Sequence, residues 1–338
     1  MSNVLEDLLA ERDYLLADGA TGTNMMGMGL PAGQAPDLWN LDKPENVTRL
    51  HESFLEVGSD IVLTNTFGSN RCRLALDKAA DRTEAINEAG ARIARASADA
   101  AGRPVVVAGS MGPTGELIEP LGSFTVEETQ QVFTQQAEAL ARGGVDVLWI
   151  ETIFAFDELR AALAAAASTG LPVASTMTFD TAGRTMMGDT PKDAVEFFHS
   201  ASPTPIAYGA NCGAGPAMLI ETICGFSRCA APGDVIIAKG NCGVPRMEGG
   251  EVRYSGNEEI MAAYARMARD AGARIVGGCC GTTPKHLKAI ADAIAGYTPK
   301  EAPASAAIEA ALGPIKPPGA ESDPEEPKRS KRRSRRAR

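Results

Sequence analysis

The chain has 338 residues, of which 44% are hydrophobic and 22% are charged, and these values are ordinary for a globular protein. Its net charge of −10 is uneven, because residues 328–338 carry eight Lys and Arg and no acid, which leaves 25 basic against 43 acidic residues elsewhere. The acidic body argues against a nucleic-acid-binding domain, and no apolar run approaches the roughly 18 residues of a membrane span.

The N-terminal stretch MSNVLEDLLAERDYLL carries acids where a secretory signal peptide has basic residues, so we predict a cytoplasmic protein. Cysteines in a reducing compartment rarely form a disulfide framework, and an odd number argues against complete pairing. The chain has seven, at positions 72, 212, 224, 229, 242, 279 and 280.

Eight short apolar runs are spread evenly along the chain. Each is typical of a strand that is buried on both faces. In chain order they are Tyr14–Ala17, Asp60–Thr66, Pro104–Ser110, Val145–Thr152, Leu171–Thr178, Ile206–Cys212, Val235–Asn241 and Arg274–Cys280.

Eight stretches with helical periodicity alternate with these runs. Thr125 and Glu128 have the spacing of a capping box, and Thr190 and Thr283 each precede a proline, as at a helix start. The predicted helices are Glu45–Val57, Asp81–Ala101, Thr125–Leu140, Asp157–Ala167, Asp193–His199, Ala217–Phe226, Glu258–Ala271 and Pro284–Ala295.

Eight alternating strand and helix units predict an α/β fold, the (β/α)8 TIM barrel. A doubly wound sheet is the alternative, but no G-x-G-x-x-G follows the first strand. We predict one barrel domain over residues 1–300. Residues 301–338 are predicted to be a disordered linker and basic tail, for which a weak contact with RNA or a membrane surface is an alternative to simple solvation.

Chemistry in a TIM barrel sits at the carboxyl ends of the strands, and four cysteines end predicted strands. Cys212, Cys279 and Cys280 suit a catalytic zinc site whose fourth position takes a thiol substrate. Buried packing and a vicinal disulfide are alternatives, and Cys242 is a rival ligand by position. Flanking glycines free the backbone so that both adjacent sulfurs reach one ion: Gly277, Gly278 and Gly281.

Two carboxylates also end predicted strands. Asp18 and Glu151 are placed to hold the ammonium group of an amino acid beside the metal. The alternatives are a helix cap for Asp18 and a buried ion pair for Glu151. Asn65 and Ser110 end neighbouring strands and are predicted to contact the substrate as well, whereas no histidine ends a strand, which argues against a histidine-based triad.

At this point the chain resembles the homocysteine S-methyltransferase family. The matching segments lie between about residues 10 and 296 in the family's order. They are DGATGT at 18–23, LTNTFG at 63–68, GPTGE at 112–116, ET at 151–152, MTFD at 177–180, GANC at 209–212 and GGCCGT at 277–282.

The resemblance implies zinc on Cys212, Cys279 and Cys280, L-homocysteine as the methyl acceptor, and Asp18 and Glu151 near its amino group. It also sets aside Cys242, because the family has another residue type there. The expected activity is transfer of a methyl group to the homocysteine thiol, which gives L-methionine.

The methyl donor is less determined by the sequence. The resemblance is closest to the homocysteine-binding module of cobalamin-dependent methionine synthase, while a stand-alone chain suggests glycine betaine, for which Trp39 and Phe67 are candidate aromatic contacts. Betaine is the first prediction. A methylcobalamin-carrying protein is the alternative, S-methylmethionine is third, and a non-catalytic thiol or zinc sensor is a different class. A homo-oligomer is possible.

Overall fold

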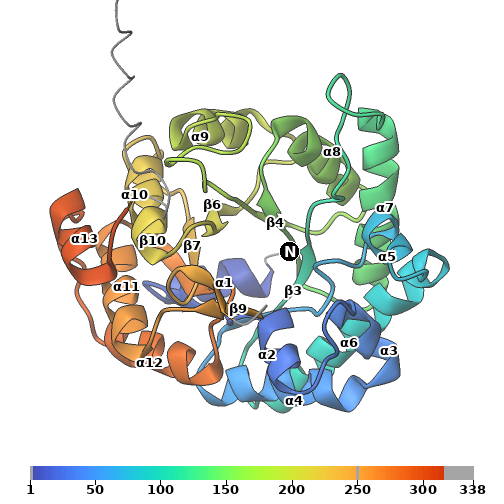
Figure 1. The fold of residues 1–338 in the computed structure, drawn as a ribbon, viewed down its shortest axis with the longest axis horizontal. Coiled ribbons are helices and arrows are strands. Elements are labelled where there is room, and N and C mark those ends of the chain that lie inside the picture. The colour runs from blue at the N-terminus through green and yellow to red at the C-terminus, as the bar shows by residue number, and fades with distance from the viewer. Residues whose placement is uncertain (1–2, 249–250, 316–338) are drawn as a thin grey trace, which may run out of the picture.

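The computed structural model describes residues 3–248 and 251–315. One eight-stranded parallel sheet runs in the order β1-β10-β7-β6-β5-β4-β3-β2 and encircles the centre of the molecule (Figure 1). The strands are β1 Leu15–Leu16, β2 Ile61–Leu63, β3 Val106–Met111, β4 Val147–Ile153, β5 Val173–Met177, β6 Ala207–Cys212, β7 Ile236–Gly240 and β10 Ala273–Gly278.

The sheet closes between β1 and β2, the two strands at the ends of this order. Ala17 and Ile61 form a parallel bridge, and the backbone N–H of Asp18 donates to the carbonyl of Ile61 at 3.0 Å. Closure of an eight-stranded parallel sheet confirms the predicted (β/α)8 TIM barrel and excludes the doubly wound alternative.

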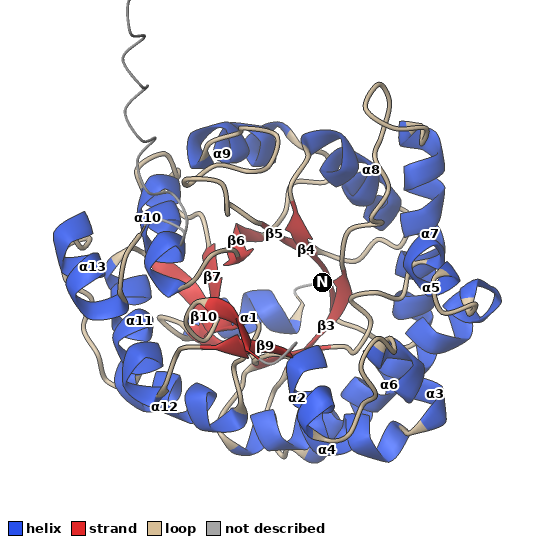
Figure 2. Ribbon diagram, viewed as in Figure 1, coloured by secondary structure: helices blue, strands red, loops and turns tan. Residues whose placement is uncertain are grey.

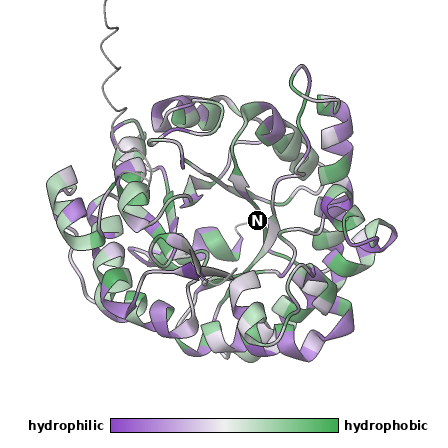
Figure 3. Ribbon diagram, in the orientation of Figure 1, coloured by the Kyte–Doolittle hydropathy of each residue, from purple (hydrophilic) through white to green (hydrophobic). Residues whose placement is uncertain are grey.

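Helices surround the ring of strands (Figure 2), and all eight predicted helices are present. Many of the outer helices carry both hydrophilic and hydrophobic residues, as the hydropathy colours show (Figure 3). No helix within residues 3–248 and 251–315 is long and apolar enough to cross a membrane. The helices are α4 Pro44–Glu56, α6 Thr83–Ala100, α7 Val126–Arg142, α8 Phe156–Ala167, α9 Pro191–Ser200, α10 Pro216–Ser227, α11 Glu258–Asp270 and α12 Pro284–Ile294.

Two apolar layers hold the barrel together. The outer layer lies between strands and helices, and the inner layer fills the barrel with side chains such as Trp149 and Ile237. Helix α1, Val4–Glu11, adds Leu5 and Leu8 to the inner layer and is visible through the ring in Figure 2. The inner layer therefore closes one end of the barrel and leaves the carboxyl ends of the strands for chemistry.

Several short elements were not predicted. A hairpin follows β7, and the other unpredicted elements, α1 included, are helices of three to eight residues in loops or near the chain ends. Besides α1, they are α2 Gly22–Gly27, η1 Pro36–Leu38, α3 Trp39–Asp42, α5 Arg71–Ala75, η2 Ala80–Arg82, β8 Pro245–Glu248, β9 Glu251–Tyr254 and α13 Ser305–Leu312.

Helix α13 corrects part of the predicted disorder beyond residue 300. Ile308 is fully buried and Leu312 is 7% exposed, because the helix packs on α10 and α11 and extends the outer apolar layer. The helix was not predicted, because only Ile308 and Leu312, at helical spacing, are large apolar residues in this alanine-rich segment. Residues 316–338, with the predicted basic tail, lie outside the described residues.

Candidate metal centre and substrate site

Three cysteines meet at the carboxyl ends of β6 and β10. The sulfurs of Cys212, Cys279 and Cys280 all lie within 4.8 Å of one another. Sheet register causes this meeting, because Gly240 of β7 pairs with Cys212 on one side and with Gly278 on the other. The structure therefore brings together the three predicted ligands, although Cys212 and Cys279 are 67 residues apart in the sequence.

The backbone around the thiols is specialised for this approach. Cys212 has a φ of +63°, a left-handed conformation that an L-residue rarely adopts. Gly281 has a φ of +78°, and a side chain at Gly278 would collide with Thr282, since an added Cβ would lie 2.2 Å from it. The glycines are thus required by positive φ and close packing, in agreement with their predicted purpose.

Two asparagines flank the thiols. Asn211 donates to Sγ of Cys279 over 3.7 Å, and its Oδ1 accepts hydrogen bonds from the N–H of Thr152 and the hydroxyl of Thr176. Asn241 donates to Sγ of Cys212 over 3.7 Å, while its Oδ1 is buried with no hydrogen-bond partner among the described residues. Asn241 thus contacts one of the three sulfurs and also carries an unpaired buried oxygen, a group that a bound cation or substrate would satisfy.

The electrostatics of the cluster also fit a cation. The interaction with Cys212 raises the pKa of Cys279, and burial and the charge of Glu151 raise it further. Three thiols at this range cannot all ionise unless a positive charge compensates them. A thiophilic divalent ion of tetrahedral preference, such as zinc, matches three sulfur donors with one position left open.

Cys242 does not join the cluster. Its side chain is 1% exposed, and it packs in the outer apolar layer. The prediction that set it aside is consistent with this place. The other three cysteines also lie outside the cluster: Cys72, Cys224 and Cys229.

A buried charged group lies beside the thiols. Oε1 of Glu151 accepts a hydrogen bond from the hydroxyl of Ser110 at 2.5 Å. Asp18 is 1% exposed, and its Oδ1 lies 2.7 Å from the ammonium of Lys239. Burial raises the pKa of Glu151, while the charge of Lys239 opposes that rise. The predicted residues Asp18, Glu151 and Ser110 therefore share one site.

Lys239 was missed in the sequence. It lies on β7 with 2% of its side chain exposed, and its ammonium is 5.9 Å from the ring centroid of Trp149. Burial acts to lower the pKa of Lys239, but the charges of Asp18 and Glu151 outweigh it and raise the pKa, which keeps the ammonium form. The available signal was a lysine within the apolar run VIIAKGN, since a charge in a buried strand requires a partner.

Tyr254 was also missed. It ends β9, and its ring lies against Gly281, where an added Cβ would come within 2.5 Å of it. Its hydroxyl forms a hydrogen bond with Cys280, and burial, followed by the charge of Cys280, raises the pKa of Tyr254. The β8–β9 hairpin thus covers one side of the thiol cluster.

Two residues predicted near the substrate lie elsewhere or are engaged. Trp39 is 1% exposed in the outer apolar layer, with the ammonium of Lys43 stacked on its ring. Asn65 donates to the carbonyl of Pro36 and to Oδ1 of Asn40, both at 2.9 Å. The prediction that Trp39 contacts the methyl donor is therefore wrong, because its ring is buried. A contact between Asn65 and the substrate stays a prediction.

With this geometry in place, comparison with known proteins identifies the family. Residues 15–294 match the homocysteine S-methyltransferase family. The chain belongs to that family. The thiol cluster lies within the matched region.

Individual known proteins resemble this chain in sequence or in fold. Methionine synthase of Mycobacterium tuberculosis is 31% identical over 307 residues, which cover 86% of this chain and 25% of that protein. The chain thus spans about a quarter of the length of that relative. The homocysteine methyltransferase MmuM from Escherichia coli has the same fold, with a TM-score of 0.72 in both its oxidized and metallated forms. Its identity is 24% and 23%, over 86% and 85% of this chain and 99% of each MmuM chain.

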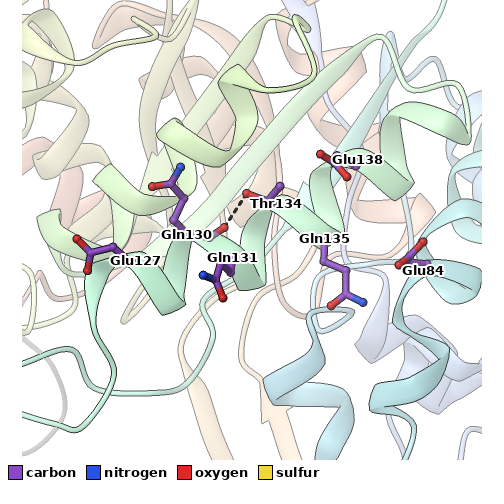
Figure 4. Close-up of a pocket in the computed structure, with 7 residues that line it drawn as sticks. All are labelled: Glu84, Glu127, Gln130, Gln131, Thr134, Gln135 and Glu138. Carbon is purple, nitrogen blue, oxygen red and sulfur yellow. Dashed lines mark hydrogen bonds between the residues drawn. The ribbon is translucent and has the colours of Figure 1, made fainter.

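Two hollows lie away from the thiol cluster. One is a polar groove along α7, lined by glutamines and glutamates (Figure 4), and its side chains come mainly from a single solvent-facing helix. The other is bounded by loops that follow β3, β4 and β5, and Leu117, Leu121 and Met187 line it at 47–63% exposure. This apolar rim is on the same side of the barrel as the thiol cluster.

Proposed function

We propose that this chain is a zinc-dependent homocysteine S-methyltransferase that forms L-methionine. The observation that carries the proposal is the meeting of three cysteine sulfurs within 4.8 Å of one another, beside the buried carboxylate of Glu151. Thiolate donors suit zinc, and a carboxylate at this place suits the ammonium group of an amino acid thiol.

In this proposal, different residues bind the metal, bind the substrate ammonium and position the metal ligands. Cys212, Cys279 and Cys280 would hold zinc, which, when bound, lowers the pKa of a thiol substrate so that its thiolate exists at neutral pH. Glu151 binds and orients the substrate ammonium. Asn211 and Asn241 donate to the ligand sulfurs and keep them in place.

Methyl transfer itself needs alignment more than acid or base groups. The homocysteine thiolate attacks the methyl carbon of the donor in line. One sulfur–carbon bond forms, and the bond from that carbon to the donor breaks with its electron pair. The barrel rim orients both molecules and excludes water. Such positioning is the main way in which an enzyme lowers the barrier of a displacement of this kind.

Two donors remain in competition. The sequence favoured glycine betaine, but the burial of Trp39 leaves Phe67, at 40% exposure, as the remaining one of the two candidate aromatics. The exposed apolar rim of Leu117, Leu121 and Met187 is typical of a surface that meets another protein. Together with the similarity to part of a methionine synthase, this rim supports a separate methylcobalamin-carrying protein as our first candidate and betaine as the second.

The test is methionine formation by the zinc-loaded full chain from homocysteine and one labelled donor at a time. The donors are betaine, S-methylmethionine, free methylcobalamin and a methylcobalamin-loaded carrier protein. Methionine from the carrier alone supports our order, and methionine from betaine reverses it. Zinc binding without turnover with any donor would favour the thiol or zinc sensor. A cytoplasmic location and a homo-oligomeric state stay predictions.

A further inference from the structure

The buried side chain of Lys239 lies beside the carboxylates of the substrate site. Neither the proposed metal binding nor the proposed methyl transfer involves it. Its ammonium contacts Oδ1 of Asp18 at 2.7 Å and the main-chain oxygen of Asp18 at 3.3 Å. The face of Trp149 lies on the barrel side of this ammonium. Lys239 is therefore fixed between the apolar interior and the carboxylates.

Asp18 is fully engaged by the protein. Its Oδ1 accepts from Lys239, and its Oδ2 accepts from the backbone N–H of Leu63 at 2.8 Å. With 2% of its side chain exposed, Asp18 offers little surface to a ligand. A buried carboxylate that has both an ion-pair partner and a backbone donor is satisfied without substrate.

Glu151 differs from Asp18 in this respect. It is 7% exposed, and Ser110 is its hydrogen-bond partner through Oε1. Its Oε2 accepts no hydrogen bond from the described residues. An ionised carboxylate with a free oxygen on the substrate side is a ready acceptor for an ammonium group.

The charges then sum to a simple result. Asp18 and Lys239 cancel, so of the two carboxylates only Glu151 keeps a negative charge that is free to pair with an ammonium. We propose that Lys239 is the positioning residue that sets this charge: it removes Asp18 from substrate binding and leaves Glu151 as the carboxylate that binds the ammonium of homocysteine. The inference rests on the proposed function and reassigns Asp18, which the family resemblance placed at the amino group.

A binding experiment tests the inference without any methyl donor. Homocysteine and 4-mercaptobutyrate, which lacks the ammonium group, are titrated calorimetrically into the zinc-loaded protein. The wild type should prefer homocysteine by about tenfold or more, as expected for one charge-assisted contact in a buried site. Glu151→Gln should abolish the preference. A preference that survives in Glu151→Gln overturns the inference, because another group then binds the ammonium.

A double-mutant cycle tests the role of Lys239 itself. Asp18→Asn frees Lys239 to pair with Glu151 and to compete with the substrate, so homocysteine affinity should fall by about tenfold or more. Adding Lys239→Met to Asp18→Asn removes the competitor and should recover most of the loss, with zinc content unchanged throughout. A double variant as weak as Asp18→Asn overturns the inference, since Asp18 would then contact the ammonium directly.

The double variant Asp18→Asn/Lys239→Met keeps the net charge of the wild type. It is expected to fold, because a neutral pair of similar shape replaces a buried ion pair. If the single variant Asp18→Asn fails to fold, the double variant compared with the wild type still decides the inference, because a large loss of homocysteine affinity in the double variant would mean that Asp18 contacts the ammonium directly. Failure of the proposed function gives a different result: the zinc-loaded wild type would bind neither thiol.

Discussion

The sulfur of Cys242 lies 3.4 Å from Nδ1 of His286, in the apolar layer between the barrel strands and α12. Cys212 is the last residue of β6, and Cys242 lies two residues after the end of β7, so position along the chain distinguishes the two only weakly. The direction of the side chain distinguishes them clearly, because Cys242 packs outward toward α12 while Cys212 faces Cys279 and Cys280.

This difference predicts opposite effects on metal binding. Cys280→Ala removes one of three sulfur donors and should reduce bound zinc in the purified protein to a small fraction of the wild-type content. Cys242→Ala is the matched control and should keep its zinc, although a smaller buried side chain will cost some stability. Metal analysis after dialysis measures both. Full zinc content in Cys280→Ala would refute the ligand assignment.

Asn211 is predicted to position the metal ligands. Asn211→Ala breaks hydrogen bonds with Thr152 and Thr176 and leaves buried groups unpaired, which should cost about 1–3 kcal/mol of unfolding free energy. It also frees Cys279, so a coloured chelator should extract zinc faster than from the wild type.

The control for this variant is Asn87→Ala, another fully buried asparagine, which bonds to Ser69 and Thr83 instead. It should lose comparable stability and release zinc at the wild-type rate. Equal acceleration in both variants would mean that loss of stability alone loosens the metal.

His51 predicts a pH dependence of stability that is separate from catalysis. It is 1% exposed on α4, and burial lowers the pKa of His51 from 6.5 to about 4. Between these values the unfolded chain binds a proton that the folded chain does not, so unfolding becomes easier as the pH falls. From about pH 7 to about pH 5 this group should remove about 2 kcal/mol of unfolding free energy.

Urea unfolding at both pH values measures this effect, and His51→Leu provides the comparison. The variant should show a loss between the two pH values that is smaller than that of the wild type by about the same 2 kcal/mol. Identical pH dependence in the two proteins would exclude a buried neutral His51.

Helix α13 predicts a contribution to stability from beyond residue 300. Ile308→Ala removes a fully buried side chain from the contact with α10 and α11 and should cost about 2–4 kcal/mol of unfolding free energy. Ala306→Ser, at an exposed position of the same helix, should change the stability little. Denaturant unfolding that gives equal midpoints for Ile308→Ala and the wild type would contradict the packing of α13.

The barrel was predictable from the sequence because its signals are local. Each strand is a short apolar run, and helices such as α7 and α9 begin with capping boxes at Thr125 and Thr190. The β8–β9 hairpin and α13 were missed, since the former is polar and glycine-rich and the latter has only two apolar residues that reach the core.

The site was predictable in part. Cys212, Cys279 and Cys280 stand at strand ends, and barrel closure brings strand ends together whatever their separation in sequence. The pairing of Lys239 with Asp18 spans 221 residues and depends on where two side chains point inside the barrel. The burial of Trp39 likewise depends on how η1 and α3 fold onto α4 and α6, which no local pattern reveals.

The central claim is that the three-cysteine centre binds the homocysteine thiol through its open position. Cobalt in place of zinc tests it most directly, because the thiolate-to-cobalt charge-transfer absorbance reports how many thiolates are bound. We predict a saturable rise of this absorbance on titration with homocysteine, and none with homoserine, which has a hydroxyl in place of the thiol. An absorbance that homocysteine leaves unchanged would contradict the account.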